Sequence, residues 1–171
     1  MGKDFGEALS KAGASIRHDV RPGDIGDIIS MHGQLYTREH GYSLDFEAYV
    51  AKTFSAYPWP LGTRERLWIV EKNGALSGSI AIVRASETEA QLRWLLLSPE
   101  LRGFGLGTCL VEEAIAFSRS SGYRAVLLWT EASLTTATRL YRQAGFTLTQ
   151  TRTGMTWGAQ RTEERYDLSL D

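Results

Sequence analysis

Residues 95–108 read LLLSPELRGFGLGT, and this stretch decides the fold. It ends an apolar strand that we predict over residues 90–97, turns sharply, and enters a helix predicted over residues 105–120 through three glycines spaced two residues apart. The first N–H groups of such a helix have no intrahelical acceptor, and the helix dipole adds partial positive charge. Glycine lets the backbone come close to phosphate oxygens and adopt a positive φ. The stretch therefore predicts a site for a phosphate-bearing ligand.

The segment before this stretch predicts an antiparallel hairpin. Asn73 and Gly74 form the dipeptide most typical of a type I′ turn, whose two central residues both need a positive φ. Apolar runs over residues 67–70 and 79–83 flank the turn. We expect these runs to pair, and residues 90–97 to add a third strand next to them.

Helices and strands on both sides complete a mixed α/β fold with the order βααβββαβαββ. Asp24 is the predicted N-cap of the first helix, and a second amphipathic helix is expected from Ser43. The other predicted elements are a strand over residues 14–20, a buried strand over 125–129, a helix over 133–144, and closing strands over 146–151 and 165–170.

Composition indicates an ordinary globular chain. Of the 171 residues, 43% are hydrophobic and 23% are charged, so residues 14–171 are expected to form a single domain after a loose N-terminal segment over residues 1–13. The formal charge of −1 gives no general basic surface for nucleic acid, and no apolar stretch is long enough to span a membrane. We therefore expect neither nucleic acid nor membrane as a partner.

The cysteine and histidine content indicates neither a disulfide nor a metal site. Cys109 is the only cysteine, which excludes an internal disulfide and is simplest to explain by a reducing, cytoplasmic location. The three histidines and Cys109 do not show metal-ligand spacing, so no metal is expected.

Two motifs make the chain resemble the GCN5-related N-acetyltransferases (GNAT). Residues 102–107, RGFGLG, match the family signature Arg/Gln-x-x-Gly-x-Gly/Ala, and residues 140–146, LYRQAGF, resemble its Leu-Tyr-x-x-x-Gly-Phe motif. Residues 21–26 (RPGDIG) and 36–42 are similar to the acetyltransferase half of proteins that also carry a MarR-type DNA-binding domain. A dinucleotide-binding fold is disfavoured because the glycines follow antiparallel strands, and a Walker loop lacks its Gly-Lys-Ser/Thr.

The resemblance implies a mostly antiparallel, splayed sheet flanked by helices. Acetyl-CoA, as co-substrate, would lie between the strand ending at Leu97 and the strand ending at Thr130. Backbone groups would hold the pantetheine like an added strand, and the glycine-rich turn would hold the pyrophosphate. The implied cofactor-binding residues are Leu95, Leu96, Leu97, Arg102, Gly103, Phe104, Gly105, Leu106, Gly107 and Thr108.

Tyr141 matches the general acid of the family. A phenol beside the sulfur can give a proton to the thiolate that leaves when an amine attacks the thioester. Tyr141 also shares an apolar helix face with Leu134, Ala137 and Leu140, so a purely structural role in the core is the alternative. Leu134 stands where many family members have an asparagine that contacts the cofactor.

A base is needed as well, because an aliphatic amine is mostly protonated at neutral pH. Glu131 is the first candidate, since it ends a buried strand and residues 128–131 resemble a family motif that ends in a catalytic glutamate. Glu39 is the second candidate and lies near the acceptor wall that the resemblance implies. A solvated surface charge is the alternative for both.

The acceptor site is expected to involve Glu39, Tyr36 and Trp157, but aromatic walls of this kind suit many amines. The function predicted from the sequence is direct transfer of an acetyl group to a primary amine of a small molecule or peptide. One alternative is a non-catalytic acyl-CoA-binding or sensing module. Another is an interaction module whose closing strands, residues 146–170, pair in a homodimer.

Overall fold

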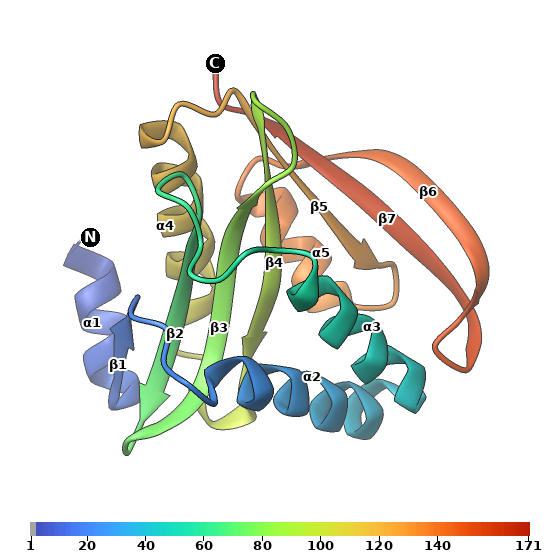
Figure 1. The fold of residues 1–171 in the computed structure, drawn as a ribbon, viewed down its shortest axis with the longest axis horizontal. Coiled ribbons are helices and arrows are strands. Elements are labelled where there is room, and N and C mark those ends of the chain that lie inside the picture. Colours follow the sequence, from blue (N-terminus) through green and yellow to red (C-terminus); the bar gives the residue numbers. More distant parts are fainter. Residues whose placement is uncertain (1–2) are drawn as a thin grey trace.

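A computed structural model describes residues 3–171 as a seven-stranded sheet with helices on both faces (Figure 1). The strand order is β1-β2-β3-β4-β5-β7-β6, and only β4 and β5 run parallel. The strands are β1 (Ala14–Arg17), β2 (Arg66–Lys72), β3 (Ala75–Arg84), β4 (Glu89–Leu97), β5 (Ala125–Glu131), β6 (Thr147–Thr156) and β7 (Ala159–Ser169). The helices are α1 (Lys3–Ala12), α2 (Asp24–His40), α3 (Leu44–Ser55), α4 (Leu106–Ser120) and α5 (Thr135–Gln143), with a short 3-10 helix over Pro99–Leu101.

The predicted fold class and the order of elements from β1 to β7 are confirmed. Asn73 and Gly74 have φ values of 52° and 77°, as a type I′ turn requires, and they join β2 to β3. The predicted N-cap at Asp24 is wrong, because Gly23 holds that position. The Asp24 carboxylate instead accepts hydrogen bonds of 2.7 and 2.8 Å from the Arg17 guanidinium and so ties α2 to β1.

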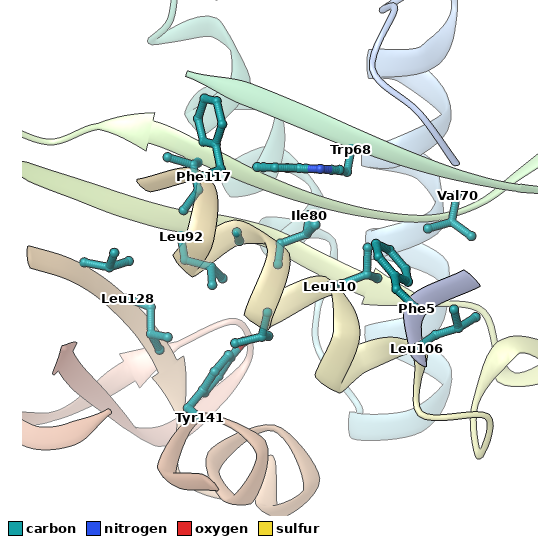
Figure 2. Close-up of a cluster of buried hydrophobic side chains, with 14 of the residues drawn as sticks. Phe5, Trp68, Val70, Ile80, Leu92, Leu106, Leu110, Phe117, Leu128 and Tyr141 are labelled. Carbon is teal, nitrogen blue, oxygen red and sulfur yellow. The ribbon is translucent and has the colours of Figure 1, made fainter. Parts of the chain in front are cut away.

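The N-terminal segment is not loose. Lys3–Ala12 forms the amphipathic helix α1, whose Phe5, Ala8, Leu9 and Ala12 are buried in the core beside α4 (Figure 2). These four residues have the spacing of one helical face, and their burial stabilises a helix that its polar composition does not predict. The prediction for residues 1–13 is therefore wrong over the part of it that the structure describes.

Each face of the sheet has its own core. On one face, α1, α4 and α5 pack over β2 to β5, and the side chains of Trp68, Ile80 and Leu110 are fully buried. On the other face, α2 and α3 cross β2, β3 and β4 and bury Ile28, Phe54 and their neighbours (Figure 1). The sheet is thus packed between two helix layers, and residues of β4 contribute to both cores.

The sheet splits between β4 and β5. The two strands pair only from Glu89 to Gln91 on β4, and a register shift in the β3–β4 ladder then follows near Trp94, which has a φ of 52°. A bulge of this kind bends its strand away from the neighbouring one. β5 continues instead along β7, and β6 and β7 form a long arm at the edge of the sheet (Figure 1).

Candidate active site

One cavity of about 560 Å³ opens where β4 and β5 diverge, with α2, α3, α4 and α5 around it. Its lining includes every residue that the sequence predicted for the site except Phe104. The Phe104 side chain is 39% exposed and does not line the cavity. The prediction that Phe104 belongs to the site therefore has no support from the side chain. The sequence motifs and the acceptor residues, which lie far apart in the chain, meet in the same space.

The glycine-rich turn presents backbone N–H groups to this cavity. Gly103 and Gly105 have φ values of 84° and 80°, and Gly105 is the N-cap of α4. Cys109 donates the first helical hydrogen bond, 3.1 Å to the Gly105 carbonyl, so the N–H groups before it lie at the open end of the helix. No atom lies within 4 Å of a Cβ built on Gly103 or Gly105. The turn is shaped to take an anion against its backbone.

Arg102, which the resemblance assigns to cofactor binding, contacts both β4 and α2. Its Nε donates a 3.0 Å hydrogen bond to the Leu97 carbonyl, and its Nη1 lies 3.0 Å from Oε2 of Glu39. The side chain therefore joins the end of β4 to α2 while it lines the cavity beside the glycine turn. Glu39, the second candidate base, is held in this ion pair.

The end of β4 has one open backbone edge. Leu96 and Leu97 pair with Ser79 and Gly78 of β3 on one side, while the pairing with β5 on the other side ends at Gln91. The backbone groups that face β5 beyond that point are available to a ligand that runs between the two strands. An extended chain with amide groups would fit there as an added strand.

Tyr141 is a core residue that also borders the cavity. It is 6% exposed and lies in the buried cluster with Leu128 and Leu110 (Figure 2). It packs edge-on against Phe146, with ring centroids 6.0 Å apart. Burial raises the pKa of the phenol well above its ordinary value, and the nearby Tyr36 raises it further. The hydroxyl therefore keeps its proton at neutral pH and is available as a donor.

Glu131 is 5% exposed and is held by several donors. Its Oε1 accepts a 3.2 Å hydrogen bond from the Ser133 N–H. Its Oε2 accepts hydrogen bonds from the Ser133 hydroxyl and, at 3.4 Å, from the Tyr42 hydroxyl, and Nη1 of Arg161 lies 3.8 Å away. The Arg161 guanidinium also stacks on the Tyr42 ring at 3.9 Å. The carboxylate is thus fixed in place by both its own loop and β7.

Aromatic rings from three segments form the wall opposite the glycine turn. Trp157, in the β6–β7 turn, stacks on Tyr42 with ring centroids 5.1 Å apart and contacts Phe46 edge-on at 5.1 Å. Tyr36 lies 4.5 Å from the Phe46 ring, and burial raises its pKa to about 12. The predicted acceptor residues Tyr36 and Trp157 therefore lie in one cluster, although about 120 residues separate them along the chain.

Sequence reasoning missed three residues of the site. Trp94 stacks on Phe54 at 3.7 Å and donates a 2.9 Å hydrogen bond to Thr53, which fixes the bulge of β4. Arg161 and Arg93 line or support the cavity from β7 and β4. The available signal for Arg93 was a charged residue inside the apolar run AQLRWLLL.

The described part of the chain, residues 3–171, has no group of three or more histidine, cysteine, aspartate or glutamate residues arranged to hold a metal ion. None of its helices has the length and apolar character that crossing a bilayer requires.

Comparison with known proteins identifies the family. A model of the acetyltransferase (GNAT) family matches residues 32–146, which is more than half of the chain. The chain belongs to this family. A similar GNAT protein, an uncharacterized N-acetyltransferase of Schizosaccharomyces pombe, is 32% identical over 133 residues, which cover 75% of this chain and 80% of the relative. The predicted activity, acetyl transfer from acetyl-CoA to an amine, is that of this family.

Solved GNAT structures share the fold. YncA from Salmonella typhimurium, in a structure with its cofactor acetyl-CoA, superimposes with a TM-score of 0.69 at 20% identity, and 92% of this chain and 94% of that chain are covered. A GNAT acetyltransferase from Staphylococcus aureus Mu50 reaches a TM-score of 0.73 at 16% identity, with 92% and 99% covered. The present chain fits acetyl-CoA by its own features, namely the open edge of β4 and the uncovered N–H groups at the start of α4.

Proposed function

We propose that this acetyltransferase transfers the acetyl group directly to a primary amine, with Tyr141 as general acid and Glu131 as general base. The observation that supports the assignment is that both side chains line one cavity, Tyr141 from the core on one face of the sheet and Glu131 in contact with Tyr42 of the core on the other face. Tyr141 lies on α5 beside the glycine turn, and Glu131 lies at the end of β5 against Tyr42.

The donor end of the cavity is built mainly from backbone. Acetyl-CoA, when bound, supplies an acetyl group already activated as a thioester. The N–H groups from Gly103 to Thr108 bind its phosphates in this proposal, and the open edge of β4 over residues 95–97 holds its amide chain. These groups are positioned before any ligand binds, so binding costs little reorganisation.

Glu131 takes the proton that the amine must lose. Among the described residues, Oε1 accepts a hydrogen bond only from the Ser133 N–H, whereas Oε2 is surrounded by three donors. A carboxylate oxygen has room for a second hydrogen bond, so Oε1 can accept a proton from an ammonium group. Arg161 and Ser133 keep the carboxylate from turning away.

Tyr141 acts on the leaving group, the sulfur of the thioester. The amine nitrogen forms a bond to the carbonyl carbon, the carbon–sulfur bond breaks, and Tyr141 gives its hydroxyl proton to the sulfur. The products are an acetamide and a thiol. Because burial raises the pKa of Tyr141, the phenol regains its proton readily after each turnover.

Replacement of Tyr141 by phenylalanine tests this assignment. We expect kcat to fall by about 100-fold or more, the usual contribution of a general acid, while the dissociation constant for acetyl-CoA stays within about threefold of wild type. Stopped assays of thiol release on a panel of amines, together with calorimetric titration of acetyl-CoA, give the two quantities.

Tyr123→Phe is the matched control, because Tyr123 is also a buried core tyrosine but does not line the cavity. If Tyr141→Phe and Tyr123→Phe retain the same kcat, Tyr141 is only a core residue and the acid must be sought elsewhere. If wild type binds acetyl-CoA but acetylates no amine, the catalytic proposal itself fails.

A further inference from the structure

Arg93 places a charged group on the acceptor side of the sheet. It lies on β4 directly opposite Ala81 of β3, and Ala81 belongs to the core under α2 and α3. Residues directly opposite on antiparallel strands point to the same face. The Arg93 side chain therefore lies on the face of α3 and Trp157, where it lines the cavity.

The Arg93 guanidinium has no partner among residues 3–171. Its Nε is shut off from solvent without a hydrogen-bond acceptor, and the side chain forms neither an ion pair nor a contact over an aromatic ring within that range. Every other arginine there that is not exposed has an ion pair, a hydrogen bond or a ring beneath it: Arg17, Arg64, Arg66, Arg161 and Arg165. An unsatisfied, sheltered donor on a cation is costly, so the Arg93 guanidinium is available to bind an acceptor oxygen.

The carboxylates of the cavity do not supply that oxygen. Three glutamates line it, and each is paired with an arginine other than Arg93: Glu39 with Arg102 at 3.0 Å, Glu131 with Arg161 at 3.8 Å, and Glu163 with Arg152 at 2.9 Å. Of the three arginines in the lining, Arg102 is paired with Glu39 and Arg139 lies on α5, so Arg93 is the positive charge on β4 that no cavity glutamate pairs with. A charge of that sign attracts an anion and repels a polycation.

The positions of Arg93 and Glu131 match the two ends of an amino acid. Gln91 and Leu127 are the last paired residues of β4 and β5, Arg93 follows two residues later on one strand, and Glu131 follows four residues later on the other. Both side chains lie on the α2/α3 face of the sheet, Arg93 opposite Ala81 and Glu131 against Tyr42, and both line the cavity that opens between the two strands. At about 3.3 Å per residue, Glu131 lies farther along its strand than Arg93 does, so a molecule with an ammonium and a carboxylate would meet both groups in this cavity.

We propose that the acceptor is an amine that carries a carboxylate close to its amino group, as a free amino acid does, and that Arg93 binds this carboxylate. The inference rests on the proposed function, since Glu131 must receive the amine. The planar guanidinium offers two parallel N–H donors, which suit a carboxylate better than any single neutral acceptor. Polyamines and lysine side chains lack the anion and are disfavoured as acceptors.

The test compares acceptors that differ only in the carboxylate. The twenty proteinogenic L-amino acids, the same amino acids as C-terminal amides, and spermidine are assayed with acetyl-CoA by thiol release. At least one amino acid is expected to have a kcat/KM that is tenfold or more above that of its amide, in line with loss of a charge-assisted pair.

Variants of Arg93 locate the effect. Arg93→Gln should raise KM for the preferred amino acid by about tenfold or more and leave KM for its amide unchanged, and Arg93→Lys should restore part of the difference. Arg84→Gln is the matched control, because Arg84 is an exposed arginine on β3 outside the cavity. The thermal midpoint of Arg93→Gln should not fall, since an unpaired cation is removed.

Each outcome decides the proposal. Preference for amides or spermidine, or an equal KM change for acid and amide in Arg93→Gln, overturns the carboxylate subsite and leaves the acetyltransferase assignment intact. Absence of any acetylated amino acid also overturns it. Failure of every amine, with acetyl-CoA bound, removes the proposed function as well, and the calorimetric titration of acetyl-CoA separates that case from a protein that binds no donor.

Discussion

The two ends of the cavity are built in different ways. The half that we propose for the donor, residues 95–108, comes from one continuous stretch and offers backbone groups at a strand edge and a helix start. The half that we propose for the acceptor consists of α2, α3, Arg93 and the β6–β7 turn, and it offers side chains brought together from across the chain. Backbone recognition depends on local conformation, whereas side-chain recognition depends on tertiary packing.

This difference explains why the donor could be identified from a motif and the acceptor could not. A pyrophosphate is bound by N–H groups that any residue carries, and only the glycines that permit the turn leave a mark in the sequence. An acceptor is selected by charges and rings whose partners are set by the fold. Substitutions in the two halves should therefore affect different quantities.

The largest effect is expected for Gly105→Glu in the donor half. The new carboxylate would stand where the phosphates bind, at a φ of 80° that disfavours any side chain. Affinity for acetyl-CoA should fall by about 1000-fold or more, which is about 4 kcal/mol, as measured by calorimetry.

Gly122→Glu is its matched control at the other end of α4. Gly122 has a φ of 78° and open space around its Cβ position, so the backbone strain is similar, but it does not line the cavity. Equal loss of acetyl-CoA binding in both variants would mean that strain, and not an anion site, determines the result.

The next largest effect is expected for Phe5→Ala, which removes a contact between α1 and the core beside α4, the helix that begins at the glycine turn. Phe5 is 4% exposed in the core beside α4, so Phe5→Ala should lower the free energy of unfolding by about 3–4 kcal/mol. Urea denaturation measures this directly. A change below about 0.5 kcal/mol would indicate that the N-terminal segment is loose after all, as its composition suggested.

His32 makes the stability of the acceptor half depend on pH. Burial lowers the pKa of His32 to about 4, although its ring nitrogen Nδ1 lies 2.8 Å from the Ile28 carbonyl. Between the ordinary pKa near 6.5 and about 4, the unfolded chain binds a proton that the folded chain does not. The free energy of unfolding should therefore fall by about 3 kcal/mol as the pH drops through that range, and then stay constant with respect to this group.

The corresponding variant is His32→Gln, which keeps a donor near Ile28 but cannot titrate. Its free energy of unfolding, followed by denaturant titration at each pH, should vary less between pH 6.5 and 4 than that of wild type. Identical slopes for the two proteins would show that His32 titrates normally.

The smallest effect is expected for Thr53→Val under the bulge of β4. The variant removes the acceptor of the Trp94 Nε1 hydrogen bond, 2.9 Å long, and leaves a sheltered N–H without a partner. The free energy of unfolding should fall by about 1–2 kcal/mol. KM for the amine should rise, and the affinity for acetyl-CoA should not change. Thr53→Ser keeps the hydroxyl and should behave like wild type; if it loses as much as Thr53→Val, packing of the methyl group is the cause.

Much of the fold could be predicted from the sequence because the signals were local. The Asn73-Gly74 turn, the glycine-rich start of α4 and the strand periodicities each depend on a few consecutive residues. α1 was missed although Phe5 and Leu9 have helical spacing, since a short polar helix is stabilised only by the core that it covers.

The site was predictable where its residues belong to local motifs, but not where their partners come from distant segments. The residues of the glycine motif other than Phe104 line the cavity, but Arg102 pairs with Glu39 and Glu131 pairs with Arg161, and neither partner could be found from sequence spacing. Those contacts depend on how α2 and β7 approach β4 and β5. Arg93 carried a visible signal, a charge in an apolar strand, but its unpartnered state emerges only from the three-dimensional arrangement.

Initial-rate kinetics test the central claim, that the two halves of the cavity hold both substrates at once, most directly. The rate of thiol release is measured while acetyl-CoA and the preferred amine are varied together. Direct transfer predicts double-reciprocal lines that intersect, because both substrates must be bound before the acetyl group moves. Parallel lines, together with an acetylated protein detected by mass spectrometry in the absence of amine, would show a covalent intermediate and contradict the account.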